Sequence, residues 1–182
     1  MREIVLASQS PRRKELLQKI VQDFRIDISL IPEKKPLLYP LKKVPQYLAK
    51  QKALDVYQRN QESLVLAADT IVICKHQILG KPKNKMDAQR MITLLSGKTH
   101  IVVTGVYLKC KEFHKSFSCI TKVTFKKLSN QEIEEYCNLT TIYDKAGAYA
   151  IQGEAKKFIF KIKGSYDNVV GLPIEKLKTY FN

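Results

Sequence analysis

The sequence predicts an α/β fold, in which a mixed sheet is flanked by helices. Apolar runs typical of buried strands, such as 4–7 and 64–73, alternate along the chain with amphipathic stretches typical of helices. Two neighbouring segments, 101–108 and 117–125, look like long paired strands of a hairpin. Alternation combined with hairpins favours a mixed sheet, strongly bent into two lobes around a deep cleft.

The size and composition of the chain fit one domain over residues 1–182, built as two lobes. The chain has 182 residues, of which 45% are hydrophobic, so a sizeable core is available. Its apolar runs are far shorter than a bilayer span, and its start lacks a signal-peptide core. We therefore expect a cytoplasmic protein without a membrane partner. The four cysteines are widely spaced and the three histidines form no helical pair, which argues against a zinc site or a disulfide scaffold.

The chain is strongly basic, with a formal net charge of +15 from 32 basic and 17 acidic residues. Such a charge raises nucleic-acid binding as an alternative function. However, the lysines are spread in short runs, and the chain has neither a basic tail nor an aromatic ribonucleoprotein motif. A generally lysine-rich surface is the simpler interpretation, so no specific nucleic-acid partner is expected. The charge would still steer a polyanionic small substrate toward a cleft.

The first elements are a strand over 4–7, a short turn and a helix. Ser10 offers a hydroxyl N-cap and Pro11 opens the helix, whose apolar face extends to Ile20 and Val21. The alternating segment 24–30 then predicts a strand with one wet face. Further helices are expected over 45–60, 85–96, 129–137 and 173–180.

The first turn of the first helix carries three cations, Arg12, Arg13 and Lys14. The helix dipole favours acids at this end, where backbone N–H groups are also free. An anion bound at this turn would satisfy the backbone donors and the cations together. The alternative is that the three basic side chains simply extend into water.

An aspartate, Asp69, lies in the middle of the most apolar run of the chain, 64–73. This run predicts a central strand that is buried on both faces. An isolated buried carboxylate is costly, so the presence of Asp69 in this run requires a reason. The alternative is an N-cap or turn residue at a strand that ends early.

The chain resembles the Maf family of nucleotide pyrophosphatases over essentially its whole length. The resemblance rests on motifs that occur in order: Ser8-x-Ser10-Pro11-Arg12-Arg13-x-Glu15-Leu16-Leu17, Ala68-Asp69-Thr70, Gly80-Lys81-Pro82, Leu95-Ser96-Gly97-Lys98-Thr99-His100, Asp144-Lys145-Ala146-Gly147, Ile151-Gln152-Gly153, and Gly164-Ser165-Tyr166 through Val170-Gly171-Leu172-Pro173. It implies hydrolysis of a nucleoside triphosphate to the monophosphate and pyrophosphate, assisted by a divalent cation such as Mg²⁺ or Mn²⁺. It also implies a fold similar to that of the inosine triphosphatase house-cleaning enzymes.

The resemblance further implies a set of site residues. Asp69 would be catalytic, Glu33 and Asp69 would bind the metal, and the substrate would be bound by Ser8, Arg12, Arg13, Lys52, Lys81 and Gln152. These residue types suit the reaction, because arginine and lysine bind phosphate oxygens and carboxylates bind hard cations. Three of the assignments have simpler alternatives. Glu33 would be a solvated acid paired with Lys34 and Lys35, Lys52 would lie on a solvated helix face, and Gln152 would be a structural amide.

Three positions look like the branch of the family that resembles dTTP and UTP pyrophosphatases: Arg12 after Pro11, Thr70 after Asp69, and Gln152 before Gly153. The alternatives are a 7-methyl-GTP pyrophosphatase, or a non-catalytic nucleotide- or nucleic-acid-binding protein linked to cell division. Members of the family often resemble dimers, so a homodimer is left open.

Overall fold

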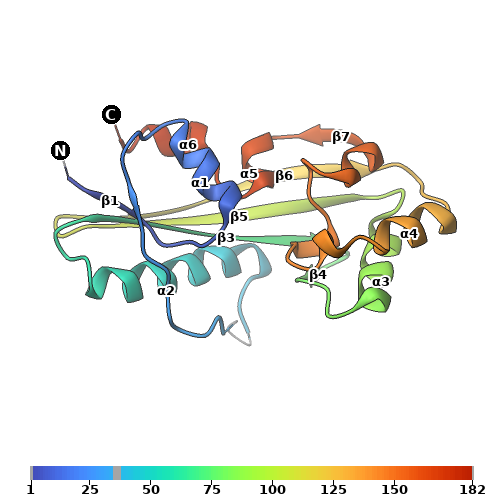
Figure 1. Cartoon of the computed structure of the whole chain (residues 1–182), viewed down its shortest axis with the longest axis horizontal. Helices are drawn as coiled ribbons and strands as arrows, with labels where there is room; N and C mark the ends of the chain where they lie inside the picture. Colours follow the sequence, from blue (N-terminus) through green and yellow to red (C-terminus); the bar gives the residue numbers. More distant parts are fainter. Residues whose placement is uncertain (1, 35–37, 182) are drawn as a thin grey trace. The chain divides into compact units, whose positions relative to one another are not determined.

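Figure 1 shows the computed structural model of the chain, which describes residues 2–34 and 38–181. Its strands are β1 (Ile4–Leu6), β2 (Arg25–Ile26), β3 (Leu64–Cys74), β4 (Gln77–Leu79), β5 (Thr99–Lys109), β6 (His114–Phe125) and β7 (Ile159–Lys163). Its α-helices are α1 (Pro11–Gln18), α2 (Val44–Gln58), α3 (Lys85–Leu95), α4 (Asn130–Cys137), α5 (Tyr166–Val170) and α6 (Ile174–Lys178). The four helices predicted after the first are present, the last of them shortened to α6.

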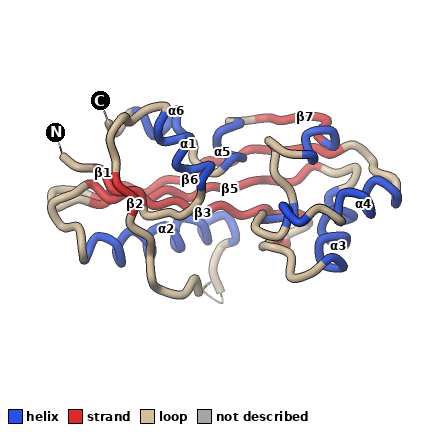
Figure 2. The backbone as a smooth tube through the Cα atoms, in the orientation of Figure 1, coloured by secondary structure: helices blue, strands red, loops and turns tan. Residues whose placement is uncertain are grey.

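The strands form a mixed sheet, as the sequence predicts (Figure 2). Their order is β2-β1-β3-β5-β6-β7, and β4 pairs with β3. The strand β1 is parallel to both of its neighbours, β2 and β3, whereas β4 and β7 pair antiparallel with β3 and β6. Among residues 2–34 and 38–181, β2 and β7 thus lie at the two ends of this strand order.

The chain divides into two compact units. The first comprises Met1–Thr70, Thr104–Cys119 and Gly171–Asn182, and the second comprises Ile71–Val103 and Ile120–Val170. The sequence predicts one domain with two lobes, a strong bend and a deep cleft. That domain description, the bend and the cleft stay predictions.

The core of the first unit lies between the strands and α2. Figure 1 shows α2 on one side of the strands of this unit and α1 with α6 on the other. Two alanines of α2, Ala49 and Ala53, are fully buried against Val5 and Val65 of the strands. Because these alanines are small, the helix can approach the sheet closely. This close packing fixes the position of Lys52, which α2 carries.

The second unit has its own core, formed by α3 and α4 with the strands beside them. Ile92 and Leu95 of α3 are fully buried, as are the rings of Phe125 and Phe158. The helix α3 ends before Gly97, whose φ of 66° is the left-handed conformation that glycine favours after a helix.

Three local predictions in the N-terminal region are wrong. The predicted strand over 24–30 is reduced to Arg25–Ile26, because the backbone at Ile28 and Leu30 is instead hydrogen-bonded to the side chains of Arg59, which directly follows α2, and of Asp55 in α2. The Ser10 side chain makes no capping bond, and its backbone N–H donates to Ser8 Oγ over 3.2 Å. The first helix ends at Gln18, so Ile20 and Val21 lie beyond it and are half-buried.

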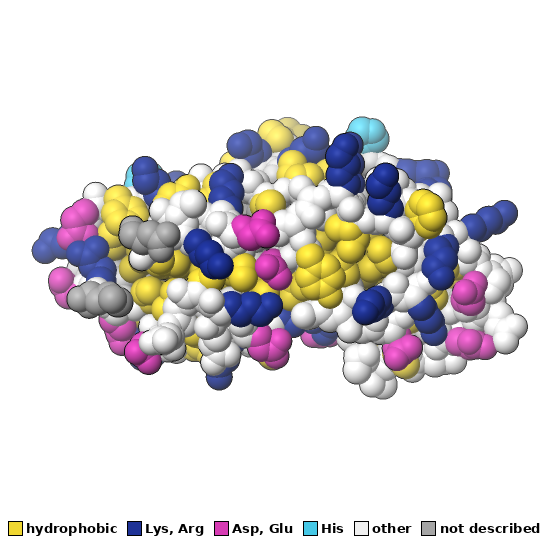
Figure 3. Space-filling view, turned by 90° about the horizontal axis from the view of Figure 1, so that it is seen from above, with side chains coloured by type: hydrophobic (Ala, Val, Ile, Leu, Met, Phe, Trp, Pro, Cys, Tyr) yellow, Lys and Arg dark blue, Asp and Glu magenta, His cyan; other side chains and the backbone are white. Residues whose placement is uncertain are grey.

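The surface is basic without a basic stripe on the face shown in Figure 3. Lysine and arginine side chains are scattered over this face, between acidic and apolar ones. This distribution agrees with the predicted lysine-rich surface. None of the helices in residues 2–34 and 38–181 has both the length and the apolar character that a membrane crossing requires.

Candidate active site

Asp69 lies inside β3, an 11-residue strand whose other residues are buried, apart from half-buried Thr70. Its side chain is 11% exposed. The alternative of a turn or N-cap residue is therefore wrong. The carboxylate has a direct partner, because Lys52 Nζ donates a hydrogen bond of 2.7 Å to Asp69 Oδ1. The carboxylate is therefore buried but not isolated, since the ammonium group of Lys52 offsets part of the cost of its burial.

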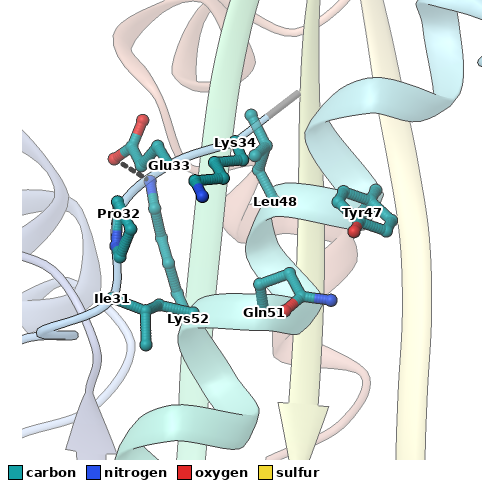
Figure 4. A pocket seen from close by; sticks show the side chains of 8 residues that line it. All are labelled: Ile31, Pro32, Glu33, Lys34, Tyr47, Leu48, Gln51 and Lys52. Atoms are coloured by element: carbon teal, nitrogen blue, oxygen red, sulfur yellow. Dashed lines mark ion pairs between the residues drawn. The ribbon is translucent and has the colours of Figure 1, made fainter. Parts of the chain in front are cut away.

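Lys52 bridges two carboxylates. Its Nζ lies 2.7 Å from Asp69 Oδ1 and 2.8 Å from Glu33 Oε1. The Lys52 side chain is 13% exposed, so the alternative of a solvated helix face is wrong. Figure 4 shows Lys52 reaching from α2 to Glu33 on the facing loop. The Glu33 side chain is 60% exposed, and its second suggested partner, Lys35, lies outside the described residues.

Burial makes Asp69 more basic than an ordinary aspartate. Loss of water around the side chain raises its pKa, and the nearby charge of Glu33 acts in the same direction. The positive charges of Lys52 and Arg13 lower the pKa but do not outweigh the burial. A carboxylate with a raised pKa is better suited to accept a proton from water at neutral pH.

A hollow of about 290 Å³ opens beside Lys52 and Glu33 (Figure 4). Its walls are residues 31–34 of the loop, together with Tyr47, Leu48 and Gln51 of α2. The hollow is at the lower end of the size range of small-molecule pockets, so it suits part of a ligand. It therefore places an open space next to the carboxylate of Glu33 and the ammonium group of Lys52.

Arg13 connects three segments of the first unit. Its Nε donates to the Gly171 carbonyl over 2.9 Å, Nη1 to Ser8 Oγ over 3.2 Å, and Nη2 to Thr70 Oγ1 over 3.1 Å. A guanidinium has five N–H donors, so these three bonds leave it able to donate to a phosphate as well. Arg13 thus holds the turn after β1 next to Asp69, because Thr70 directly follows Asp69 in β3.

The structure brings together five of the predicted site residues: Ser8, Arg13, Glu33, Lys52 and Asp69. Arg12 is half-buried in the first turn of α1, which contains no acidic residue. An anion bound at that turn remains a prediction. Lys81 and Gln152 are exposed residues of the second unit, so their approach to the other five also remains a prediction.

Sequence reasoning missed the residues that support Arg13. Thr104 Oγ1 lies 2.9 Å from Thr70 Oγ1, and Thr104 is fully buried. A polar residue inside the apolar run 101–108 was the available signal. The Gly171 carbonyl is a backbone group, and a sequence pattern does not identify a backbone acceptor of this kind.

We expect the two arginines of this turn to contribute differently to the free energy of unfolding. We expect Arg13→Ala to lower the free energy of unfolding by about 2 kcal/mol or more, because it leaves partly buried hydrogen-bond acceptors unpaired. Arg12→Ala should leave stability nearly unchanged, because removing one of the crowded cations relieves repulsion at the helix start. Urea unfolding of both variants checks this. Equal stability of the two variants would contradict the structural role of Arg13.

The residue types gathered at this site are typical of a protein that binds a polyphosphate and hydrolyses it. An α/β fold that places a buried, basic carboxylate beside a lysine and an arginine can bind a polyphosphate and activate water. Two solved structures share the fold. The Staphylococcus aureus Ham1 protein matches with a TM-score of 0.58 and 14% identity over 99% of this chain and 98% of that one. A HAM1 protein from Coxiella burnetii matches with a TM-score of 0.54 and 16% identity, over 100% and 98%.

The chain belongs to the family described as Maf-like protein, whose pattern matches residues 3–182. Curated relatives agree with this membership. A dTTP/UTP pyrophosphatase of Bacillus cereus is 46% identical over 177 residues, which cover 97% of this chain and 93% of the relative. A dTTP/UTP pyrophosphatase of Bacillus anthracis is equally similar, with the same identity and coverage. The family resemblance and the fold class predicted from the sequence are therefore confirmed.

Proposed function

We propose that the protein hydrolyses dTTP and UTP to the nucleoside monophosphate and pyrophosphate. The names of relatives that are 46% identical support this function. The observation in the structure that carries it is the convergence of Asp69 and Glu33 on the ammonium group of Lys52. Phosphoryl transfer depends on positioning and charge neutralisation, and this cluster offers both.

Each residue of the site has its own role in the reaction. Asp69 accepts a proton as water attacks the α-phosphorus, and the bond from that phosphorus to the bridging oxygen of the β-phosphate breaks. Pyrophosphate leaves with the bonding electrons. Arg12, Arg13, Lys52 and Lys81 neutralise the phosphate oxygens, and Ser8 adds a hydroxyl donor. These roles follow the family resemblance and suit the chemistry of each group.

A divalent cation suits the two carboxylates. Because both reach the same ammonium group, they are close enough together to share one small cation with the phosphates of the substrate. Among the described residues, no group of three or more acidic, histidine or cysteine side chains forms a site that could hold a metal without the substrate. Glu33 and Asp69 would thus hold Mg²⁺ or Mn²⁺ together with the triphosphate. When bound, the cation neutralises charge that develops on the phosphate oxygens.

We assign recognition of the nucleobase to the exposed side-chain amide of Gln152. An amide both donates and accepts hydrogen bonds, which suits the O4 and N3–H edge of uracil and thymine. Arg12 and Thr70 are the other two positions that favour dTTP and UTP over 7-methyl-GTP. A cytoplasmic location and a homodimer remain expectations from the sequence.

The function is tested by identifying the products. The purified protein, incubated with dTTP or UTP and Mg²⁺, should release pyrophosphate and the monophosphate, and chelation of the metal should stop the release. Release of orthophosphate with the diphosphate would show cleavage at the wrong bond. No release from any triphosphate with Mg²⁺ or Mn²⁺ would favour a non-catalytic nucleotide-binding protein.

The pairing of Lys52 with Asp69 predicts a shift in the pH profile. The charge of Lys52 lowers the pKa of Asp69, so Lys52→Met should raise that pKa. Since Asp69 acts in its ionised form, the acid limb of kcat/KM should move to higher pH. Lys50→Met alters an exposed lysine of the same helix and is the matched control. An unchanged acid limb in Lys52→Met would show that Asp69 does not titrate in catalysis.

A further inference from the structure

The loop that carries Glu33 has little apolar packing to hold it in place. Ile28 is 41% exposed, Leu30 is 74% exposed and Ile31 is 37% exposed. Burial of apolar side chains therefore contributes little to fixing this segment. Yet Glu33 reaches Lys52 over 2.8 Å at the far end of the loop. Another interaction must determine where the loop lies.

Polar side chains of α2 and of Arg59, the residue that directly follows it, hold the backbone of this loop. Asp55 Oδ2 accepts a hydrogen bond of 2.9 Å from the Leu30 backbone N–H. Arg59 Nη2 donates to the Ile28 carbonyl over 2.9 Å and lies 3.0 Å from Asp27 Oδ1. These contacts replace the ladder that a longer strand would have formed.

The contacts follow one face of α2. Lys52, Asp55 and Arg59 are spaced by three and four residues, which places them next to one another on a helix surface. The loop runs along this face in the opposite direction, so that Asp55 meets Leu30 three residues before Glu33 meets Lys52. Arg59, at the C-terminal end of α2, also pairs with Asp55 over 3.5 Å.

Asp55 is a strong acceptor for this purpose. Its side chain is 14% exposed. Burial raises its pKa, but the hydrogen bond from the Leu30 N–H and the charge of Arg59 outweigh this, and the pKa is lowered overall. Asp55 is thus ionised at neutral pH, and a hydrogen bond to an ionised acceptor is stronger than one between neutral groups.

We propose that Asp55, supported by Arg59, is a positioning residue that sets the reach of Glu33 toward Lys52 and Asp69. Asp55 itself touches neither substrate nor metal. It acts through the loop backbone and therefore through Glu33. The catalytic part of this inference depends on the proposed function, in which Glu33 binds the metal with the triphosphate.

A double-mutant cycle tests the inference. Asp55→Ala in the unaltered protein should lower kcat/KM for dTTP about tenfold, as expected from the loss of a charged hydrogen bond. In a Glu33→Gln background the same substitution should change kcat/KM less than about twofold, because residues that act through one another are not additive. Asp55→Asn, which keeps an oxygen acceptor for the Leu30 N–H, should restore most of the activity. Equal losses in both backgrounds, or no loss in either, would overturn the inference.

Hydrogen exchange gives a readout that does not need turnover. Asp55→Ala should speed exchange of the Leu30 amide at least tenfold, while the amides of β3 keep their protection. The matched control is Glu132→Ala, which removes another carboxylate bond to a backbone N–H, that of Ser129 over 2.8 Å. This control should leave both Leu30 exchange and kcat/KM unchanged. If no triphosphate is cleaved, the proposed function fails, and unchanged Leu30 exchange in Asp55→Ala would separately overturn the positioning role.

Discussion

Asp69→Asn is expected to lower turnover of dTTP at least ~100-fold, the lower end for loss of a positioned acid–base group. The substitution keeps the shape of the side chain and removes its charge. Loss of the charge removes the proton acceptor, which is also one of the two carboxylates that converge on Lys52. Steady-state kinetics at saturating Mg²⁺ measure this loss. Near-normal turnover would move the catalytic role to another residue, with Glu33 the first candidate.

The Asp69→Asn variant should be at least as thermally stable as the unaltered protein. The raised pKa of Asp69 means that the folded state tolerates its ionised form less well than the unfolded state does. A neutral amide removes that cost, so the thermal midpoint should stay the same or rise. Asp23→Asn, at an exposed position, is the control for both measurements. A large fall in the thermal midpoint of Asp69→Asn would make its loss of turnover uninformative about chemistry.

Gly105→Ala is expected to destabilise the protein by about 3 kcal/mol or more, because overpacking against backbone is not relieved by a change of side-chain rotamer. Gly105 lies in β5, where the start of α2 crosses it. A Cβ at this position would overlap the backbone at Pro45 and Gln46, and it would lie 2.6 Å from Gln46 Cα. The helix that carries Lys52 would have to move away from the sheet.

Gly80→Ala is the matched control for this loss of stability. A Cβ at Gly80 would have no heavy atom within 4 Å, so the substitution adds a methyl group in open space. Thermal unfolding should show a midpoint about 10 °C lower for Gly105→Ala and nearly unchanged for Gly80→Ala. Similar midpoints for Gly105→Ala and the unaltered protein would mean that α2 does not approach β5 as closely as described.

The strands and helices that depend on strong local patterns could be predicted from the sequence. The apolar run 64–73 is β3, and Ser129 begins α4 with a capping box, because both signals lie within a few residues. The segment 24–30 was mispredicted for the opposite reason. Its alternating pattern is typical of a strand, but hydrogen bonds from α2 compete for its backbone. Such a contact joins residues 25 to 31 positions apart and leaves no local pattern.

The candidate site shows the same limit. The position of Asp69 inside an apolar run indicated a buried carboxylate, whereas its pairing with Lys52, 17 positions away, is a contact that the fold provides. The contacts of Arg13 with Gly171 and Thr70 could not be predicted, since they join residues that are 158 and 57 positions apart. Residue types therefore indicate the chemistry, whereas the supporting contacts emerge only from the fold.

The proposed preference for dTTP and UTP is tested by measuring kcat/KM for dTTP, UTP, CTP, GTP and 7-methyl-GTP under one Mg²⁺ condition. We expect dTTP and UTP to be preferred over both purine substrates, by up to about 10⁴-fold where a hydrogen-bonding edge is mismatched. A clear preference for 7-methyl-GTP would contradict the assignment of Arg12, Thr70 and Gln152, and would leave pyrophosphate release itself standing.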